Sequence, residues 1–187
     1  QEIVKNANIL KNKHTSEEKA PVNYACIFCQ STEQYSSLVA VAQKIGKMIE
    51  ETPTGLLFRI QALDTIAGKL KLLKIRKPDA KRPELGDADF TVANYPEFKR
   101  KNLSQKGFSL IARKDYEMIE LVDSKFNVRV YFSNPPLDKQ LEKQMRQRQQ
   151  RLLGVYHSHT ASDAYPSSVD VSLAVSPDIS YVLVPLK

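Results

Sequence analysis

The chain has 187 residues, which is enough for one ordinary domain with its own hydrophobic core and too few for us to expect two. Hydrophobic residues make up 42% of it and charged residues 26%, as in soluble globular proteins, and no apolar run approaches the ~18 residues of a membrane helix. The net charge of +7 favours acidic partners, such as nucleic acid, anionic lipid or acidic protein surfaces, without choosing among them.

Residues 1–30 are interpreted as a polar N-terminal segment, extended or loosely helical, with a short strand at 24–28. No apolar core of a secretory signal is present, so we expect a cytoplasmic protein, or an organellar one that has lost a targeting peptide. His14 has no obvious partner nearby and is expected to be exposed. Cys26 and Cys29 form a CxxC pair, but the chain has no further cysteine to complete a structural zinc site. We therefore interpret both as buried small hydrophobic residues.

A helical pattern follows from Tyr35, with apolar residues recurring every three or four positions up to Ile49. Pro53 ends this run, and the apolar segment 55–60 (GLLFRI) predicts a strand. Residues 66–107 are expected to form a basic insertion. Its first part, 66–77, alternates basic and apolar residues like a strand with one solvated face. Its second part, 78–107, is rich in proline and glycine and is expected to be irregular.

Three strands are predicted next, at 108–111, 118–122 and 128–132, followed by an exposed covering helix over 137–150. The basic insertion could hold an acidic partner. It lacks the interleaved aromatic residues that stack on bases, so nucleic-acid recognition is not supported.

The most informative stretch is 151–170, RLLGVYHSHTASDAYPSSVD. Residues 152–158 alternate like a strand, which places His157 and His159 on one face. A turn follows, and Ser167 to Asp170 resembles a helix start, so Asp170 could reach back toward the strand end. Two imidazoles and one carboxylate are zinc-type ligands that leave a fourth position open, as catalytic zinc sites do. The alternative is a capping box between Ser167 and Asp170 beside two ordinary strand histidines.

These residues resemble the signature of the JAMM (MPN-type) metalloprotease family, in LLGVYHSH, YPSSVD and SPDISYVLVPL. The close resemblance covers roughly residues 137–187. It implies a zinc ion held by His157, His159 and Asp170, with Ser167 helping to hold the oxyanion during amide or isopeptide hydrolysis. It also implies a ubiquitin-like or sulfur-carrier protein as substrate. One departure is Thr160, where family members usually have proline.

The fold implied is α+β (mixed α/β): a mostly antiparallel sheet flanked by helices, forming a single domain over residues 31–187. The sequence of helix, proline and GLLF also resembles the opening of the JAMM fold, where a glutamate just before the strand is the general base. This alignment nominates Glu51, four places before Gly55 instead of the usual three. A second alignment places Tyr24 at that position and leaves the base missing. Glu50 and Glu51 could also be two solvated carboxylates.

Two alternative functions remain open at this point. HSHTASDA also resembles the first motif of PHP-type phosphoesterases, but only 17 residues follow Asp170, too few for the further His and Asp motifs that those enzymes need. The second alternative is an inactive MPN-like scaffold that serves as a subunit of a larger assembly. The uncertain glutamate, Thr160 and the basic insertion are all compatible with a domain kept for binding.

Overall fold

A computed structural model of the chain describes residues 1–147, 154–159 and 180–185, and the side chains of residues 1–144 among them. The chain divides into two compact units, residues 1–141 and residues 142–187, which are described separately here. Nothing in the sequence had indicated a boundary at this position. Within the described residues, no helix has both the length and the apolar character needed to cross a membrane.

The first unit is mixed α+β, built on a large and mostly antiparallel sheet, in agreement with the predicted fold class. Its strand order is β2-β3-β4-β1-β5-β8-β7-β6, with parallel pairing only between β1 and β4 and between β5 and β8. The strands are β1 (Val22–Phe28), β2 (Gly46–Thr52), β3 (Gly55–Thr65), β4 (Gly68–Arg76), β5 (Gly86–Phe90), β6 (Phe108–Ala112), β7 (Glu117–Leu121) and β8 (Val128–Asn134). The helices are α1 (Glu2–His14), α2 (Thr32–Ile45), α3 (Tyr95–Asn102) and α4 (Leu137–Gln147).

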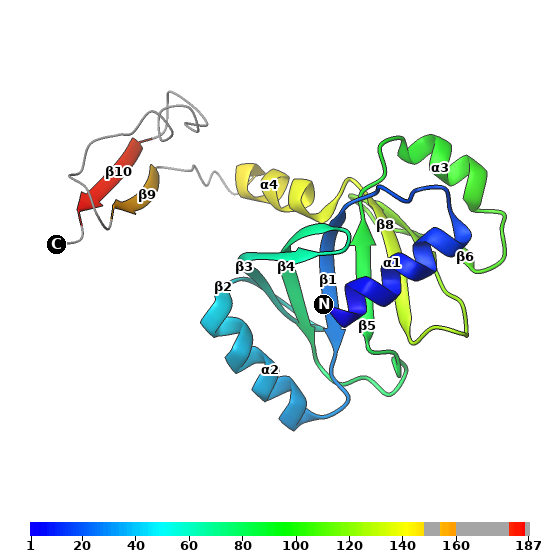
Figure 1. Cartoon of the computed structure of the whole chain (residues 1–187), viewed down its shortest axis with the longest axis horizontal. Helices are drawn as coiled ribbons and strands as arrows, with labels where there is room; N and C mark the ends of the chain where they lie inside the picture. The colour runs from blue at the N-terminus through cyan, green and yellow to red at the C-terminus, as the bar shows by residue number, and fades with distance from the viewer. Residues whose placement is uncertain (148–153, 160–179, 186–187) are drawn as a thin grey trace. The chain divides into compact units, whose positions relative to one another are not determined.

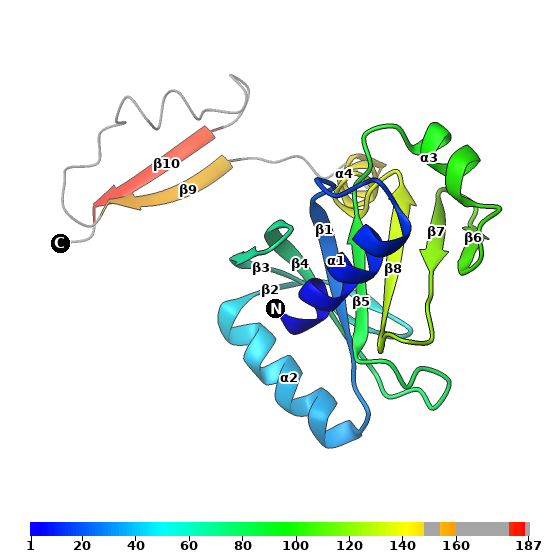
Figure 2. The same ribbon diagram turned by 45° about the vertical axis from the view of Figure 1, so that its right-hand side comes forward.

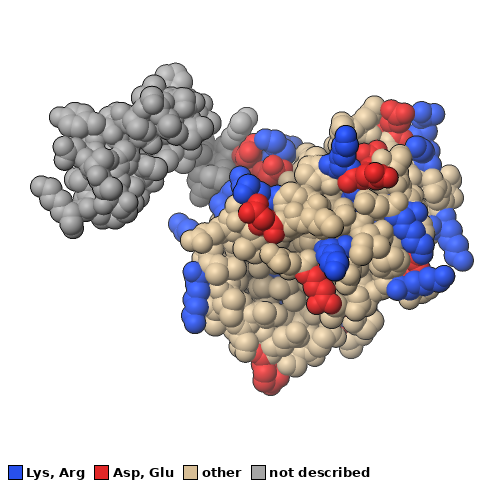
Figure 3. Space-filling model, in the orientation of Figure 1, with Lys and Arg blue, Asp and Glu red and all other residues tan. Residues whose placement is uncertain are grey.

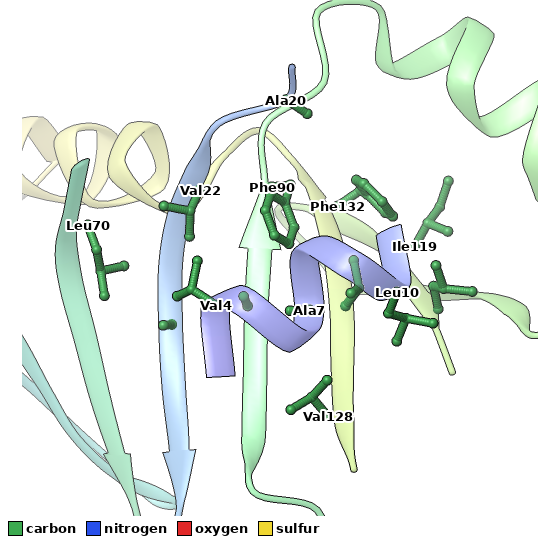
Figure 4. Close-up of a cluster of buried hydrophobic side chains, with 14 of the residues drawn as sticks. Val4, Ala7, Leu10, Ala20, Val22, Leu70, Phe90, Ile119, Val128 and Phe132 are labelled. Atoms are coloured by element: carbon green, nitrogen blue, oxygen red, sulfur yellow. The ribbon is translucent and has the colours of Figure 1, made fainter. Parts of the chain in front are cut away.

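The N-terminal helix α1 crosses one face of the sheet over β1, β5 and β8 (Figure 1, Figure 2). Val4, Ala7 and Leu10 recur at three-residue steps and are at most 1% exposed, so this stripe anchors the helix to the sheet. Figure 4 shows them pointing into a cluster that includes Phe90 and Phe132. This segment was expected to be extended or loosely helical, and residues 2–14 do form a helix; its docking on the sheet was not expected, because the apolar stripe that anchors it is short.

His14, at the end of α1, also differs from its expected role. Its Nε2 atom lies 3.0 Å from the Asp123 carboxylate, which accepts a hydrogen bond from Lys13 as well. These hydrogen bonds hold the pKa of Asp123 well below its usual range. His14 is thus half-buried and partnered, because the tertiary fold brings a loop 109 residues away beside the helix end.

The region expected to be a basic insertion instead contributes to the middle of the sheet. Its predicted strand is confirmed as β4, which pairs with both β1 and β3. The segment expected to be irregular contains β5, whose five residues are all buried, and helix α3. Two aspartates in β5 and the surrounding prolines concealed this central strand in the sequence. Figure 3 shows Lys and Arg side chains spread over the face in view, with Asp and Glu between them.

The helical pattern from Tyr35 ends four residues earlier than its apolar stripe suggested. Helix α2 stops at Ile45, and the chain continues directly into β2, which forms an antiparallel hairpin with β3. Met48 and Ile49 are exposed on β2. They continue the apolar pattern in the sequence, but they do not belong to the packed face of the helix. The two cysteines match their predicted role, since Cys26 and Cys29 are free thiols, at most 2% exposed.

The opposite face of the sheet carries helix α4, which was predicted as a covering helix. Leu137 and Leu141 pack on Leu57 and Leu72, and the adjacent Tyr24 joins the same cluster. The three strands predicted before this helix are confirmed as β6, β7 and β8.

In the second unit the structure describes two strands, β9 (Gly154–His159) and β10 (Ser180–Pro185), which pair in parallel. Strand β9 was predicted from the alternation of residues 152–158. Parallel neighbours need a connection of a dozen or more residues, and here residues 160–179 supply it.

Candidate metal site

The candidate metal site begins on β9, where His159 is the last strand residue and His157 lies two residues before it. His157 pairs with Leu183 and His159 with Pro185 of β10. Residues two apart in an extended strand share a face of the sheet. The backbone therefore has the arrangement that the sequence predicted for the two histidines, and it places them where β9 leads into the connection to β10.

Ser167 and Asp170 lie in that connection and fall outside the described residues, as does the helix start predicted there. In the part of the chain that the structure does describe, no group of three or more His, Cys, Asp or Glu side chains is placed to hold a metal ion. The ligand set of His157, His159 and Asp170 therefore stays a prediction.

Glu51, the proposed general base, lies near the end of β2 in the first unit. It is exposed, and its backbone pairs with Leu56 in the β2–β3 hairpin. The expectation that Glu51 follows a helix leading straight into the GLLF strand is wrong, because β2 stands between that helix and the strand. The nearby Glu51 charge adds to burial in raising the pKa of the Tyr35 hydroxyl. Its catalytic role has no support from the local fold and stays a prediction.

Two buried carboxyl groups with raised pKa values were not predicted from the sequence. Asp87 and Asp89 lie on one face of β5 and are only 6% and 4% exposed. Burial raises the pKa of Asp87 to about 8, with the neighbouring Asp89 carboxylate adding to the effect. Burial likewise raises the pKa of Asp89 to about 6, against the hydrogen bonds that it accepts from Ser133. The period-two alternation in Gly-Asp-Ala-Asp-Phe is the signal that could have revealed a strand with one charged face.

The C-terminal part of the chain matches a known family. The family of prokaryotic homologs of the JAB domain matches residues 107–187. This confirms the JAMM/MPN-type resemblance, over a longer segment than the one from which it was inferred, because the JAB match also takes in β6, β7 and β8. The match does not reach Glu51.

Curated relatives match a shorter piece of the chain. The "CysO-cysteine peptidases" of Mycobacterium bovis and Mycobacterium tuberculosis are each 67% identical to it over 30 residues, or 16% of this chain. The matched residues span about a fifth (20%) of the length of these relatives.

One solved structure resembles the chain over most of its length. The structural-genomics protein EC4020 has a TM-score of 0.60 and 12% sequence identity, and the likeness covers 76% of this chain and 87% of that one. At this identity the likeness concerns the fold alone.

Proposed function

We propose that this chain is a zinc-dependent hydrolase of amide or isopeptide bonds, with His157, His159 and Asp170 as its metal ligands. The observation that carries the proposal is the position of His157 and His159 two residues apart on β9, inside the segment that matches the JAB family. Two imidazoles with one carboxylate suit zinc, and three protein ligands leave one position open. The donor set therefore fits a catalytic zinc ion.

Bound zinc lowers the pKa of a water molecule to about 7 and polarises a carbonyl group. The protein has three further tasks in such a reaction: to move a proton, to hold the oxyanion and to orient the substrate. We assign the second task to the Ser167 hydroxyl, which would donate a hydrogen bond to the oxyanion. Loss of one such donor typically lowers the rate ~100- to 1,000-fold.

We assign the proton transfer to Glu51, which would accept a proton from the attacking water and return it to the leaving amine. Its exposed position on β2 leaves the carboxylate available to solvent and substrate. Glu50 precedes it in the same strand, is half-buried, and serves as a matched control. We expect Glu51→Gln to abolish hydrolysis and Glu50→Gln to leave most of it.

For the substrate we propose a ubiquitin-like or sulfur-carrier protein with an extended C-terminal tail. The relatives in Mycobacterium are named CysO-cysteine peptidases. A peptidase of that kind must recognise a chain end, so a protein with a flexible tail is the substrate class that best fits this likeness.

The second candidate function is a non-catalytic MPN-like subunit of a larger assembly. It is favoured by the position of Glu51, since this residue lies on the separate strand β2 and not at the helix-to-strand junction from which its role was predicted. A scaffold of this type could retain metal ligands without a general base. Its basic segments would then contact an acidic partner.

An activity assay separates the two candidates. The full chain is incubated with ubiquitin-like proteins that carry C-terminal amide-linked extensions, before and after chelation and with zinc restored. The hydrolase predicts zinc-dependent cleavage that Glu51→Gln removes. If zinc-loaded protein cleaves none of these conjugates, the scaffold is the correct assignment. Cleavage that survives Glu51→Gln would keep the hydrolase and remove Glu51 as its base.

A further inference from the structure

We propose that the face of the first unit's sheet opposite to α1 binds a small oxyanionic ligand, a carboxylate or a phosphate, between Lys74 of β4 and Asp87 of β5. This site is built only from residues of the first unit and is independent of the zinc motif. It rests on three side chains, Lys74 and Arg76 of β4 and Asp87 of β5, on the two strands that flank β1; Lys74 has no ion-pair partner among the described side chains, and the buried Arg76 Nε and Asp87 Oδ1 atoms accept or donate no hydrogen bond there.

The strand register fixes the positions of these residues. Lys74 and Asp87 both pair with Cys26, one from each side of β1. Neighbouring strands lie ~4.8 Å apart, so the backbones of β4 and β5 are separated by roughly 10 Å at this point. The small Cys26 side chain, only 2% exposed, lies between the two longer ones. An ammonium and a carboxyl group therefore flank a short residue on this face of the sheet.

Lys74 is half-buried and has no carboxylate within ion-pair distance among the described side chains. Its Nζ atom donates a hydrogen bond to the Thr54 hydroxyl at 2.7 Å, and burial lowers its pKa. Buried cations are normally paired, because an unpaired charge loses its hydration without compensation. Lys74 is thus suited to receive an anion.

Arg76 extends the positive side of this site by two residues along β4. Its Nη2 atom donates to Asp79 at 2.9 Å, whereas its buried Nε has no hydrogen-bond partner among the described residues. The guanidinium group lies 5.5 Å from the centre of the Phe28 ring, and that of Arg82 lies 6.0 Å from the same ring. Phe28 therefore holds two guanidinium groups beside the site.

Asp87 supplies the third group. The carboxyl group makes no hydrogen bond to any described residue, its Oδ1 atom is fully enclosed, and the side chain is more than nine-tenths buried. Burial and Asp89 raise its pKa to about 8, while Lys74, Arg76 and Arg82 lower it. At neutral pH the group is therefore mostly a neutral acid, which can donate its proton in a hydrogen bond to an anionic oxygen.

A metal ion does not fit this position. The described residues offer no group of three metal-binding side chains, Asp89 is already occupied by the Ser133 amide and hydroxyl, and two or three cationic side chains surround Asp87. Two cations with one neutral acid are complementary to an oxyanion instead. The groups that face Asp87 are Tyr24 and Cys26 of β1, Lys74 and Arg76 of β4, Arg82, Asp89, and Tyr131 of β8.

The test is calorimetric titration of the full chain with two probes, inorganic phosphate and succinate. We expect one of them to bind, which also decides between the phosphate and the carboxylate class. Lys74→Met removes one charge-assisted hydrogen bond and should weaken this binding ~10- to 100-fold. The control is Lys71→Met, which makes the same change on β4 at an exposed position on the other face and should bind like the wild type.

Asp87→Asn provides a second readout. The Asn side chain can donate a hydrogen bond at every pH, so we expect binding by this variant to fall less between about pH 7 and about pH 9 than binding by the wild type. Far-ultraviolet circular dichroism verifies that each variant is folded. The proposal is overturned if neither probe binds the folded wild type, or if Lys71→Met weakens binding as much as Lys74→Met does.

Discussion

The buried carboxyl group of Asp87 should make the first unit less stable as the pH rises, and Asp87→Asn should remove this effect. The pKa of Asp87 is about 8 in the folded chain and 3.8 in the reference state. A group whose pKa is raised by folding stabilises the folded state fully below the unfolded pKa, and this contribution disappears as the pH rises through the folded pKa. The contribution of Asp87 to the free energy of unfolding therefore decreases between about pH 4 and about pH 8.

The magnitude follows from the size of the pKa change. Each tenfold change in proton affinity is worth ~1.4 kcal/mol, so the full change corresponds to ~6 kcal/mol. Lys74, Arg76 and Arg82 are only half-buried and can move toward a charged Asp87, so we expect about half of this value, ~3 kcal/mol. That is a large part of the 5–15 kcal/mol by which domains are typically stable.

The assay is urea unfolding of wild type and Asp87→Asn between about pH 4 and about pH 9. We expect similar free energies of unfolding at the acidic end and an advantage of ~3 kcal/mol for Asp87→Asn at the alkaline end. Asp64→Asn is the control, since the Asp64 side chain is 84% exposed and solvated in both the folded and the unfolded chain. Stability curves of wild type and Asp87→Asn that stay parallel over the whole range would refute the reasoning.

Five further substitutions probe the packing of the first unit by denaturant unfolding. Phe90→Ala should cost ~3–5 kcal/mol because Phe90 is fully buried, whereas Ile66→Ala, at a residue 69% exposed, should stay within ~0.5 kcal/mol; equal losses would contradict the assigned core. Arg129→Met should cost ~3 kcal/mol because it removes the ion pair of the largely buried Glu84 and the shorter of the two ion pairs of Glu120, and an unchanged midpoint would show that these ion pairs contribute nothing. Gly55→Ala should cost more than Gly68→Ala, although both have positive φ, since a Cβ at Gly55 would lie 2.1 Å from the Ile75 carbonyl oxygen; the reverse order would exclude this clash as the cause.

The parts of the fold that the sequence predicted are those where apolar periodicity and burial coincide. Strands β7 and β8 follow this rule, since their apolar residues are largely buried. The docking of helix α1 on the sheet was not predicted, because its apolar stripe is short and because a charged residue, Lys11, is buried on the helix. Only the fold reveals that the Lys11 ammonium group donates to the main-chain carbonyls of Glu17 and Glu18.

Central strand β5 was missed for a different physical reason. Buried aspartates cost free energy unless they are neutral or hydrogen-bonded, so a segment such as GDADF is normally a turn. Here the carboxyl group of Asp89 is satisfied by Ser133 of β8, a partner 44 residues away. A hydrogen-bond partner so far away in the sequence cannot be deduced from the pattern of neighbouring residues.

In the candidate site, the two histidines could be predicted from their spacing in one strand, whereas the general base could not be predicted reliably from a distant segment. His157 and His159 lie within six strand residues, and their spacing alone determines that they share a face. The assignment of Glu51 as the general base depended on a helix that leads directly into the GLLF strand. Strand β2 lies between that helix and the GLLF strand, so the expected junction does not exist. A role that depends on two distant segments meeting needs the tertiary structure.

Zinc content, measured by elemental analysis of purified full chain, tests the central claim most directly. The proposal predicts about one zinc ion per chain, lost in Asp170→Ala and retained in Asp163→Ala, which removes a carboxylate from the same connection without touching a predicted ligand. Absence of zinc from the wild-type chain, even after zinc is supplied and excess is removed, would contradict the metal site and with it the hydrolase.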